Sequence, residues 1–246
     1  MTRIDYLEAR DGVQLAYQHR PGRGPTLVFL PGYMSDMAGA KAGALDAWAE
    51  ARGRAMLRFD YGGSGMSGGA FEAQTLRLWL DDALAMIDRI VEGPVLLVGS
   101  SMGGWLMLHA ALARPARVAG LVGIAAAPDF TSWGFTEEQK LVLLREGRLI
   151  EPSPYGETPY ITTRALWESG EGLRLLHTAI PIMCPVRLLH GLADKDVPWQ
   201  RSWELMMQLR SADVQTIFVK EGDHRLSRDQ DIALLIATVS TLLESL

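Results

Sequence analysis

Hydrophobic positions along this chain follow two spacings, one typical of β-strands and the other typical of α-helices. Most strand-like segments are short apolar runs, as expected for buried strands, whereas residues 13–19 alternate with a period of two. Strands separated by helices predict an α/β fold with a mostly parallel sheet that helices cover on both faces. No helix separates the first two strands, which allows antiparallel pairing there. The predicted strands are residues 13–19, 26–30, 55–59, 95–98, 118–125, 186–189 and 214–219, and the predicted helices are residues 41–52, 75–91, 102–113, 199–209 and 229–246.

Residues 130–184 interrupt this alternation of strands and helices. Their periodicity is irregular, prolines break it, and the segment is far longer than an ordinary crossover between strands. One interpretation is an elongated crossover without a ligand role, and the other is a cap over the carboxyl ends of the strands. Aromatic residues favour the cap, because their apolar surface needs a partner. We expect a single domain over residues 1–246 with a cap insertion at about 130–184, and substrate-binding side chains at Trp133, Tyr155, Tyr160 and Trp167.

Composition narrows the classes of partner and compartment. The net charge is −5 with no block of like charges, which argues against nucleic acid and anionic membranes as partners. The single cysteine, Cys184, excludes an internal disulfide and fits a reducing compartment. The first residues lack an apolar signal core, and no apolar run is long enough to span a bilayer. These features predict a soluble, cytoplasmic protein without stable membrane insertion.

The strongest chemical signal lies at residues 95–104, which read V-L-L-V-G-S-S-M-G-G. A short apolar strand runs into a G-x-S-x-G motif, and a long apolar helix follows. Glycines on either side of the serine let the chain turn sharply from strand to helix, because they carry no Cβ that would clash. This context predicts that Ser101 presents its hydroxyl at the mouth of the sheet as a nucleophile.

A second stretch matches similar patterns without the same context. Residues 65–69 also fit G-x-S-x-G around Ser67, and residues 63–68 fit the dinucleotide pattern G-x-G-x-x-G. Neither match opens directly into a helix, and no acidic residue ends a following strand to bind a ribose. We interpret residues 62–69 as a flexible glycine loop.

A serine hydroxyl becomes a nucleophile only when a base takes its proton, so Ser101 requires a histidine. The best of the five histidines is His224, which lies on a loop after the last predicted strand. In enzymes with this strand–turn–helix motif, the acid and then the histidine follow the serine along the chain. The other histidines fit packing, cap or turn positions better, namely His19, His109, His177 and His190.

The acid that orients the histidine is predicted at Asp194, just past a buried strand. Asp196, two residues on, suits a turn or a helix N-cap instead. Asp129 follows an earlier strand, at another position where such folds can place the acid. We favour Asp194 over these two alternatives.

The reaction also needs donors for a developing oxyanion. The backbone N–H of Met102 is one candidate, because it follows the nucleophile at a helix N-terminus. The backbone N–H of Tyr33 is the other, on the loop that follows the strand ending at Leu30. The side chain of Tyr33 is equally suited to the pocket wall.

Four segments of the chain resemble one branch of the α/β-hydrolase superfamily. They are residues 29–33 (F-L-P-G-Y), 58–61 (R-F-D-Y), 98–110 (V-G-S-S-M-G-G-W-L-M-L-H-A) and 184–191 (C-P-V-R-L-L-H-G). That branch contains mitochondrial palmitoyl-protein thioesterases, also described as acyl-glucuronide esterases, and bacterial relatives. The resemblance spans nearly the whole chain and is weakest across residues 130–180. It implies the α/β-hydrolase fold and an esterase or thioesterase activity. Because we recognise no targeting presequence, the expected location remains cytoplasmic.

The combined prediction is a serine hydrolase that cleaves a carboxylic ester or acyl thioester through an acyl-enzyme on Ser101, Asp194 and His224. The expected partner is a small-molecule acyl ester or thioester, or an S-acylated protein. No metal or organic cofactor is implied. Two rivals remain, a peptidase or carbon–carbon bond hydrolase on the same triad, and a non-catalytic ligand receptor of the same fold.

Overall fold

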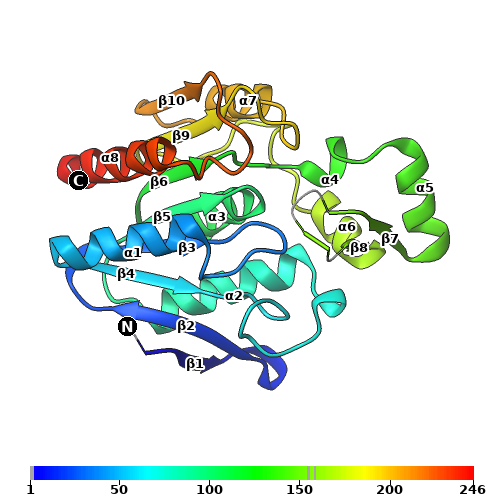
Figure 1. Ribbon diagram of the computed structural model, residues 1–246, viewed down its shortest axis with the longest axis horizontal. Helices are drawn as coiled ribbons and strands as arrows, with labels where there is room; N and C mark the ends of the chain where they lie inside the picture. Colours follow the sequence, from blue (N-terminus) through cyan, green and yellow to red (C-terminus); the bar gives the residue numbers. More distant parts are fainter. Residues whose placement is uncertain (1–2, 154–155, 158) are drawn as a thin grey trace.

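Eight strands form one sheet within the residues that this computed structural model describes, 3–153, 156–157 and 159–246 (Figure 1). They are β1 (Asp5–Glu8), β2 (Gln14–Arg20), β3 (Arg23–Leu30), β4 (Arg54–Phe59), β5 (Val95–Ser100), β6 (Val118–Ile124), β9 (Val186–Gly191) and β10 (Val214–Val219). Their order is β1-β2-β4-β3-β5-β6-β9-β10. The pairs β1–β2 and β2–β4 are antiparallel and the others are parallel, which confirms the predicted sheet. The short edge strand β1 was not predicted, because Leu7 is its only buried residue.

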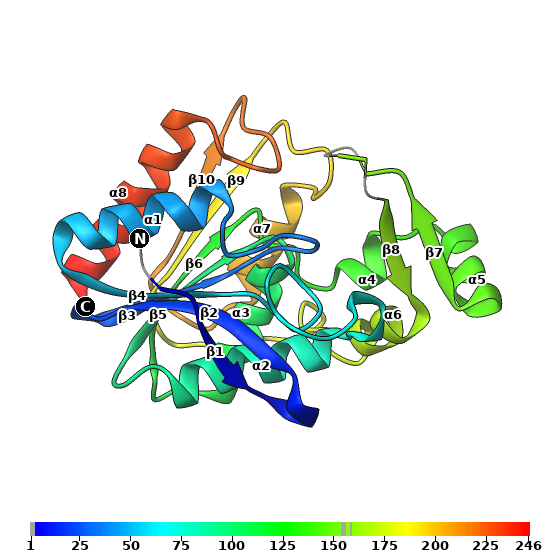
Figure 2. The ribbon, with the colours of Figure 1, turned by 60° about the horizontal axis from the view of Figure 1, so that its bottom comes forward.

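Helices cover both faces of the sheet, as predicted (Figure 2). They are α1 (Ala40–Arg52), α2 (Leu76–Arg89), α3 (Met102–Ala113), α7 (Gln200–Gln208) and α8 (Asp229–Ser245), with single 3-10 turns at η1 (Arg10–Gly12) and η2 (Phe71–Ala73). α1 and α8 pack on one face, and α2, α3 and α7 pack on the other. Alternate residues of β5 point into opposite cores, with Val95 and Leu97 toward α2 and α3, and Leu96 and Val98 toward α1 and α8. With both faces covered, the carboxyl edge of the sheet is the place left for a site.

Residues 62–69 form a hydrogen-bonded turn rather than the flexible loop that the sequence suggested. The N–H of Gly63 donates to the carbonyl of Gly68 at 2.8 Å. The Ser67 hydroxyl donates to the Asp60 carbonyl at 2.7 Å and accepts from the Ala16 N–H at 2.9 Å. Ser67 is therefore a structural residue that joins this turn to β2, and not a second nucleophile.

The cap segment, defined as residues 130–184, lies beyond one end of the sheet (Figure 1). A two-stranded antiparallel hairpin of β7 and β8 packs there with three helices. These elements are α4 (Phe130–Trp133), α5 (Glu137–Glu146), β7 (Arg148–Glu151), β8 (Tyr160–Thr163) and α6 (Arg164–Glu171). One cavity is lined both by residues at the edge of the sheet and by residues of the cap segment.

The return of the cap segment toward β9 is tied to the sheet layer. The buried carboxylate of Asp129 accepts the backbone N–H groups of Leu175 and Leu176, each at 2.8 Å. Side-chain N–H groups of Trp105 and His109, both on α3, donate to the carbonyl of Leu173 at 3.2 and 2.8 Å. Four hydrogen bonds thus hold the returning end of the cap segment against α3 and the residues that follow β6.

None of the helices in the described part of the chain combines the length and the apolar composition that crossing a membrane requires.

Candidate active site

Ser101 lies at the turn between β5 and α3 in a strained backbone conformation, with φ 54° and ψ −120°. A Cβ on Gly99 would lie 2.5 Å from the carbonyl oxygen of Gly103. A Cβ on Gly103 would overlap the carbonyl oxygens of Leu30 and Pro31. Only glycines at both positions let the helix start this close to the strands, so the chain turns sharply and the serine side chain projects outward. Such strain costs about 1–3 kcal/mol and persists where the surrounding packing enforces it.

A chain of hydrogen bonds runs from Ser101 to a buried carboxylate. The Ser101 Oγ lies 3.1 Å from Nε2 of His224, which follows β10. The Nδ1 of His224 lies 2.9 Å from Oδ2 of Asp194, in the turn after β9. Because a carboxylate only accepts, Nδ1 carries the proton and Nε2 is left to accept from the serine hydroxyl. This is the orientation in which an imidazole can take the serine proton.

The carboxylate of Asp194 is fully buried and accepts at both oxygens. Oδ1 accepts the backbone N–H groups of Asp196 and Val197, each at 2.9 Å. Oδ2 accepts from His224 and also lies 3.2 Å from Nε2 of His190. Burial raises the pKa of Asp194, but the hydrogen bonds with the two histidines outweigh it and hold that pKa well below its usual range. The group therefore stays ionised and can stabilise an imidazolium beside it.

The Nδ1 of His224 is hydrogen-bonded to Asp194, and the two alternative acids occupy other positions. Asp129 instead holds the return of the cap segment, with its backbone in the left-handed region at φ 58°. Asp196 is exposed at the cavity, and its N–H donates to Asp194. Asp194, Asp196 and His224 also place potential metal-ligand atoms within 4.8 Å of one another. Both nitrogens of His224 and both oxygens of Asp194 already have protein partners, so the arrangement suits proton transfer better than metal binding.

The two predicted oxyanion donors, the backbone amides of Met102 and Tyr33, belong to segments that adjoin Ser101. Met102 begins α3, so its N–H has no partner within the helix. Tyr33 follows Gly32, whose hypothetical Cβ would lie 3.3 Å from the Ser101 Cβ, so this loop lies directly against the serine. Among the described residues, neither amide donates to another protein group. The two N–H groups are thus free to stabilise negative charge on a substrate oxygen.

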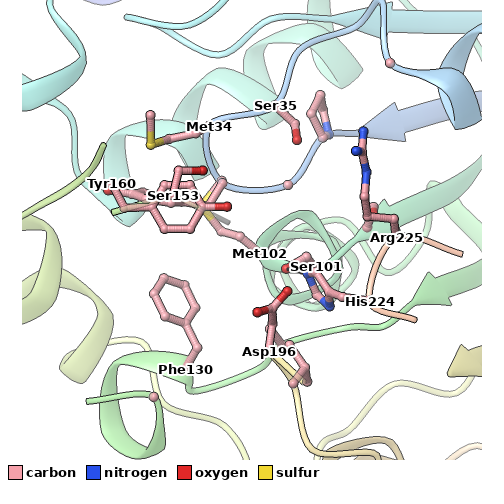
Figure 3. Close-up of a pocket in the computed structure, with 18 of the residues that line it drawn as sticks. Met34, Ser35, Ser101, Met102, Phe130, Ser153, Tyr160, Asp196, His224 and Arg225 are labelled. Atoms are coloured by element: carbon pink, nitrogen blue, oxygen red, sulfur yellow. Dashed lines mark hydrogen bonds between the residues drawn. The ribbon is translucent and has the colours of Figure 1, made fainter. Parts of the chain in front are cut away.

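A cavity of about 710 Å³ opens beside Ser101. Figure 3 shows Ser101 and His224 between an apolar side, with Met34, Phe130 and Tyr160, and a polar side that carries Arg225. Trp133, predicted from sequence, also lines the cavity.

Of the other predicted substrate-binding residues, Trp167 does not line this cavity. Trp167 points into the cap segment, where its indole N–H donates to the carbonyl of Thr131 at 3.0 Å, so it packs α6 against α4. Tyr155 lies outside the described residues. Phe130 and Met34, which sequence reasoning did not select, line the cavity instead. Phe130 stands next to the last core residues of the β6 region, a position that could have been read as the start of the cavity wall.

The side chain of Tyr33 connects the sheet edge to the cap segment. Its ring stacks edge-on against Tyr160 and Phe71, at 6.0 and 5.4 Å between centroids. Its hydroxyl donates to the carbonyl of Ile161 in β8. The backbone of Tyr33 thus lies on the loop against Ser101, and its side chain contributes to the cavity wall.

Lys41 fixes the loop that carries His224, a role that sequence reasoning missed. Its Nζ donates to the carbonyl of Arg225 at 2.5 Å, which ties the loop to the first turn of α1. Burial, followed by the charge of Arg225, lowers the pKa of Lys41 to about 8. In the sequence, a lysine at the start of a predicted helix looks the same whether it anchors a loop or lies exposed to solvent, so this role could not be predicted.

The chain is similar to known proteins over its whole length. A family profile described as serine aminopeptidase, S33 matches residues 24–155. Mouse mitochondrial palmitoyl-protein thioesterase ABHD10 is 42% identical over 248 residues, which cover 99% of this chain and 83% of that protein. The human mitochondrial protein of the same name is 41% identical over 249 residues, covering 100% of this chain and 81% of that protein.

Solved structures agree with these relationships. The mouse α/β-hydrolase domain-containing protein 10 matches with a TM-score of 0.93 and 41% identity, over 99% of both chains. A putative hydrolase from Agrobacterium vitis S4 matches with a TM-score of 0.94 and 38% identity, also over 99% of both chains. Est1E from Butyrivibrio proteoclasticus, solved with ferulic acid, has a TM-score of 0.80 at 20% identity over 98% of both chains and supports the fold alone.

The expectation of a cytoplasmic location is wrong by these comparisons. The mouse, bovine and human relatives that match along nearly the whole chain are all named mitochondrial. The sequence argument relied on a single cysteine, on the absence of an apolar signal core and on the lack of a recognised targeting presequence. The first fits several reducing compartments, the second tests only for secretion, and the third did not decide the compartment.

Proposed function

The chain belongs to the α/β-hydrolase superfamily, in the family of the palmitoyl-protein thioesterase ABHD10, and on this premise we propose that it is a serine esterase or thioesterase that forms an acyl-enzyme on Ser101. The observation that carries the proposal is the hydrogen-bonded chain from Ser101 through His224 to Asp194, with distances of 3.1 and 2.9 Å. A nucleophile, a base and an orienting acid in this order are the parts that acyl transfer needs.

The reaction follows from the placement of these groups. Ser101 Oγ attacks the substrate carbonyl while its proton passes to Nε2 of His224, and Asp194 stabilises the resulting imidazolium. The N–H groups of Met102 and Tyr33 bind the oxyanion. Collapse of the tetrahedral intermediate breaks the bond to the alcohol or thiol, which takes the proton from His224. Water then attacks the acyl-enzyme with His224 as base, which releases the carboxylic acid and restores the serine.

The cavity supports an acyl group as the part of the substrate that is bound. Its volume of about 710 Å³ lies within the usual range for small-molecule sites, and Met34, Phe130 and Tyr160 form one apolar side. The relatives named palmitoyl-protein thioesterases point to acyl thioesters, including S-acylated proteins, as the substrate class. In this arrangement the cap segment, as an insertion over the sheet edge, supplies much of the acyl-binding wall.

The test compares Ser101→Ala with Ser100→Ala, its neighbour in the chain. We expect Ser101→Ala to lose labelling by a fluorophosphonate probe and to lose several orders of magnitude in kcat on p-nitrophenyl and acyl-thioester substrates. Ser100→Ala should keep both. Turnover and labelling that persist in Ser101→Ala would refute the assignment. A wild-type protein that never labels would indicate a receptor rather than an enzyme.

A serine aminopeptidase is the second candidate, favoured by the description of the matching family. Three acidic residues, Asp36, Glu151 and Asp196, line the cavity and could bind a free α-ammonium group. Aminoacyl p-nitroanilides tested beside acyl thioesters separate the two functions, because a peptidase would give the higher kcat/KM on the amide.

A further inference from the structure

Nitrogen atoms of two histidines lie close to the same carboxylate oxygen of Asp194. His224 Nδ1 lies 2.9 Å from Oδ2, and His190 Nε2 lies 3.2 Å from it. His190 is the penultimate residue of β9, and its side chain is completely buried, whereas His224 is partly exposed at the cavity. The reaction described above uses only one of these two imidazoles.

The partners of His190 define which of its nitrogens carries the proton. Nε2 also lies 3.0 Å from the carbonyl of Val197, which can only accept, so Nε2 is the donor. Nδ1 lies 2.7 Å from the hydroxyl of Ser202, a buried residue of α7. The hydroxyl therefore donates to Nδ1, and the ring is held in the tautomer that directs its single N–H toward Asp194 and Val197.

The remaining contacts of Asp194 show why a second donor matters. Its Oδ1 accepts two backbone N–H groups from its own turn, those of Asp196 and Val197. These bonds fix one oxygen, and rotation of the carboxylate about that oxygen would still move Oδ2. Without His190, only the hydrogen bond from His224 would hold Oδ2 in position. His224 is also the group whose protonation must change during turnover, so it is a poor anchor for the carboxylate.

We propose that His190 is a positioning residue of the active site, which holds Oδ2 of Asp194 where His224 Nδ1 must meet it, with Ser202 selecting the tautomer that makes this possible. The inference rests on the proposed function and deepens it. Ser101 and His224 are then the cavity end of a longer chain of side chains, Ser101–His224–Asp194–His190–Ser202. Its buried members are Asp194, His190 and Ser202, and it extends from the cavity to α7.

Three single variants test the proposal on acetate and long-chain acyl esters. His190→Leu keeps the side-chain bulk and removes the donor, and it should lower kcat roughly 10- to 100-fold, the value of a hydrogen bond to a charged group. KM should stay within about twofold, because His190 does not line the cavity. His190→Gln, which can restore a donor at similar reach, should recover most of the lost kcat. Ser202→Ala should give a smaller loss than His190→Leu.

A double-mutant cycle with Asp194→Asn separates positioning from general support of the fold. If His190 acts through the carboxylate, His190→Leu should lower kcat much less in the Asp194→Asn background than in the wild type. All rates are divided by the number of sites that a fluorophosphonate probe labels, and thermal unfolding reports folding. Should His190→Leu be poorly folded, Ser202→Ala forms the same cycle, with a smaller loss of kcat expected in the wild-type background.

Two outcomes overturn the proposal, and they can be told apart. An equal loss from His190→Leu in both backgrounds, or no loss in either, would show that His190 only packs. A fully active Asp194→Asn variant would show that the acid of the proposed function is misassigned, and this inference would fail with it. Neither outcome depends on the identity of the natural acyl group.

Discussion

Replacing Gly99 with alanine should displace the first turn of α3 and slow the reaction. The new Cβ would lie 2.5 Å from the carbonyl oxygen of Gly103 and 2.7 Å from the Cα of Gly104. Ordinary contacts begin at 3.4 Å, so the helix start must move by about 0.9 Å. That start carries the N–H of Met102, one of the two candidate oxyanion donors.

The structure sets the size of both effects. A displacement of about 1 Å at reacting groups costs on the order of 100-fold in rate, so kcat of Gly99→Ala should fall by about that factor. Overpacking between β5 and α3 should also lower the free energy of unfolding by about 1–3 kcal/mol. Esterase kcat per fluorophosphonate-labelled site and urea unfolding measure the two effects separately.

Gly43 provides a matched control inside α1. It lies within α1, and apart from its chain neighbours and the backbone of its own helix no atom lies within 4 Å of a hypothetical Cβ. Gly43→Ala should therefore raise the free energy of unfolding by about 0.5–1 kcal/mol and leave kcat unchanged. If Gly99→Ala retained the kcat and stability of the wild type, the argument that this turn requires a missing Cβ would be refuted.

Three further results are expected. Asp194→Asn should lower kcat by a factor of about 10⁴, as in the best-studied triad. Asp129→Asn should instead lower the free energy of unfolding by about 1–3 kcal/mol and leave kcat per labelled site unchanged. The reverse pattern would assign the catalytic acid to Asp129, after the earlier strand. Burial lowers the pKa of His109, and the hydrogen bond to the carbonyl of Leu173 offsets only part of this effect. The unfolded chain therefore binds the proton of this histidine more readily, and the free energy of unfolding should fall as the pH drops below about 6.5. Urea unfolding at several pH values should show this slope, at most about 1.4 kcal/mol per pH unit, reduced in His109→Gln; an unchanged slope would contradict the assignment. In a series of acyl chain lengths, Trp133→Ala should flatten the rise of kcat/KM more than Trp167→Ala does, and equal effects would show that the cavity wall has been misplaced.

Sequence was a good guide where a local pattern dictates the structure. The buried run of β5 and the glycines around Ser101 are tied to one geometry, because few other residues could make that turn. The parallel sheet then brings the ends of β9 and β10 to the same edge, which accounts for the nearness of Asp194 and His224.

The interior of the cap segment was not predictable in the same way. Its elements are short, and each is stabilised by its neighbours more than by its own pattern. Trp167 illustrates the point, since only the packing of α6 on α4 decides whether its ring reaches the cavity. The helix start at Thr136 is an exception, because its capping box with Gln139 can be read from the sequence.

The double attachment of Tyr33 has a consequence for engineering the acyl preference. One end of this residue faces the serine and the other is fastened to β8 through the carbonyl of Ile161. Replacing the cap segment with that of a relative would therefore change the contacts of the Tyr33 side chain. It would also shift the loop that carries the Tyr33 backbone N–H. Such chimeras should have an altered kcat even on acetate esters, which are too small to contact the replaced cavity wall. Restoring the original β8, to which the Tyr33 hydroxyl donates, should return kcat toward the wild-type value. Under the proposed function, binding of the acyl chain and stabilisation of the charge on its carbonyl are therefore coupled through Tyr33.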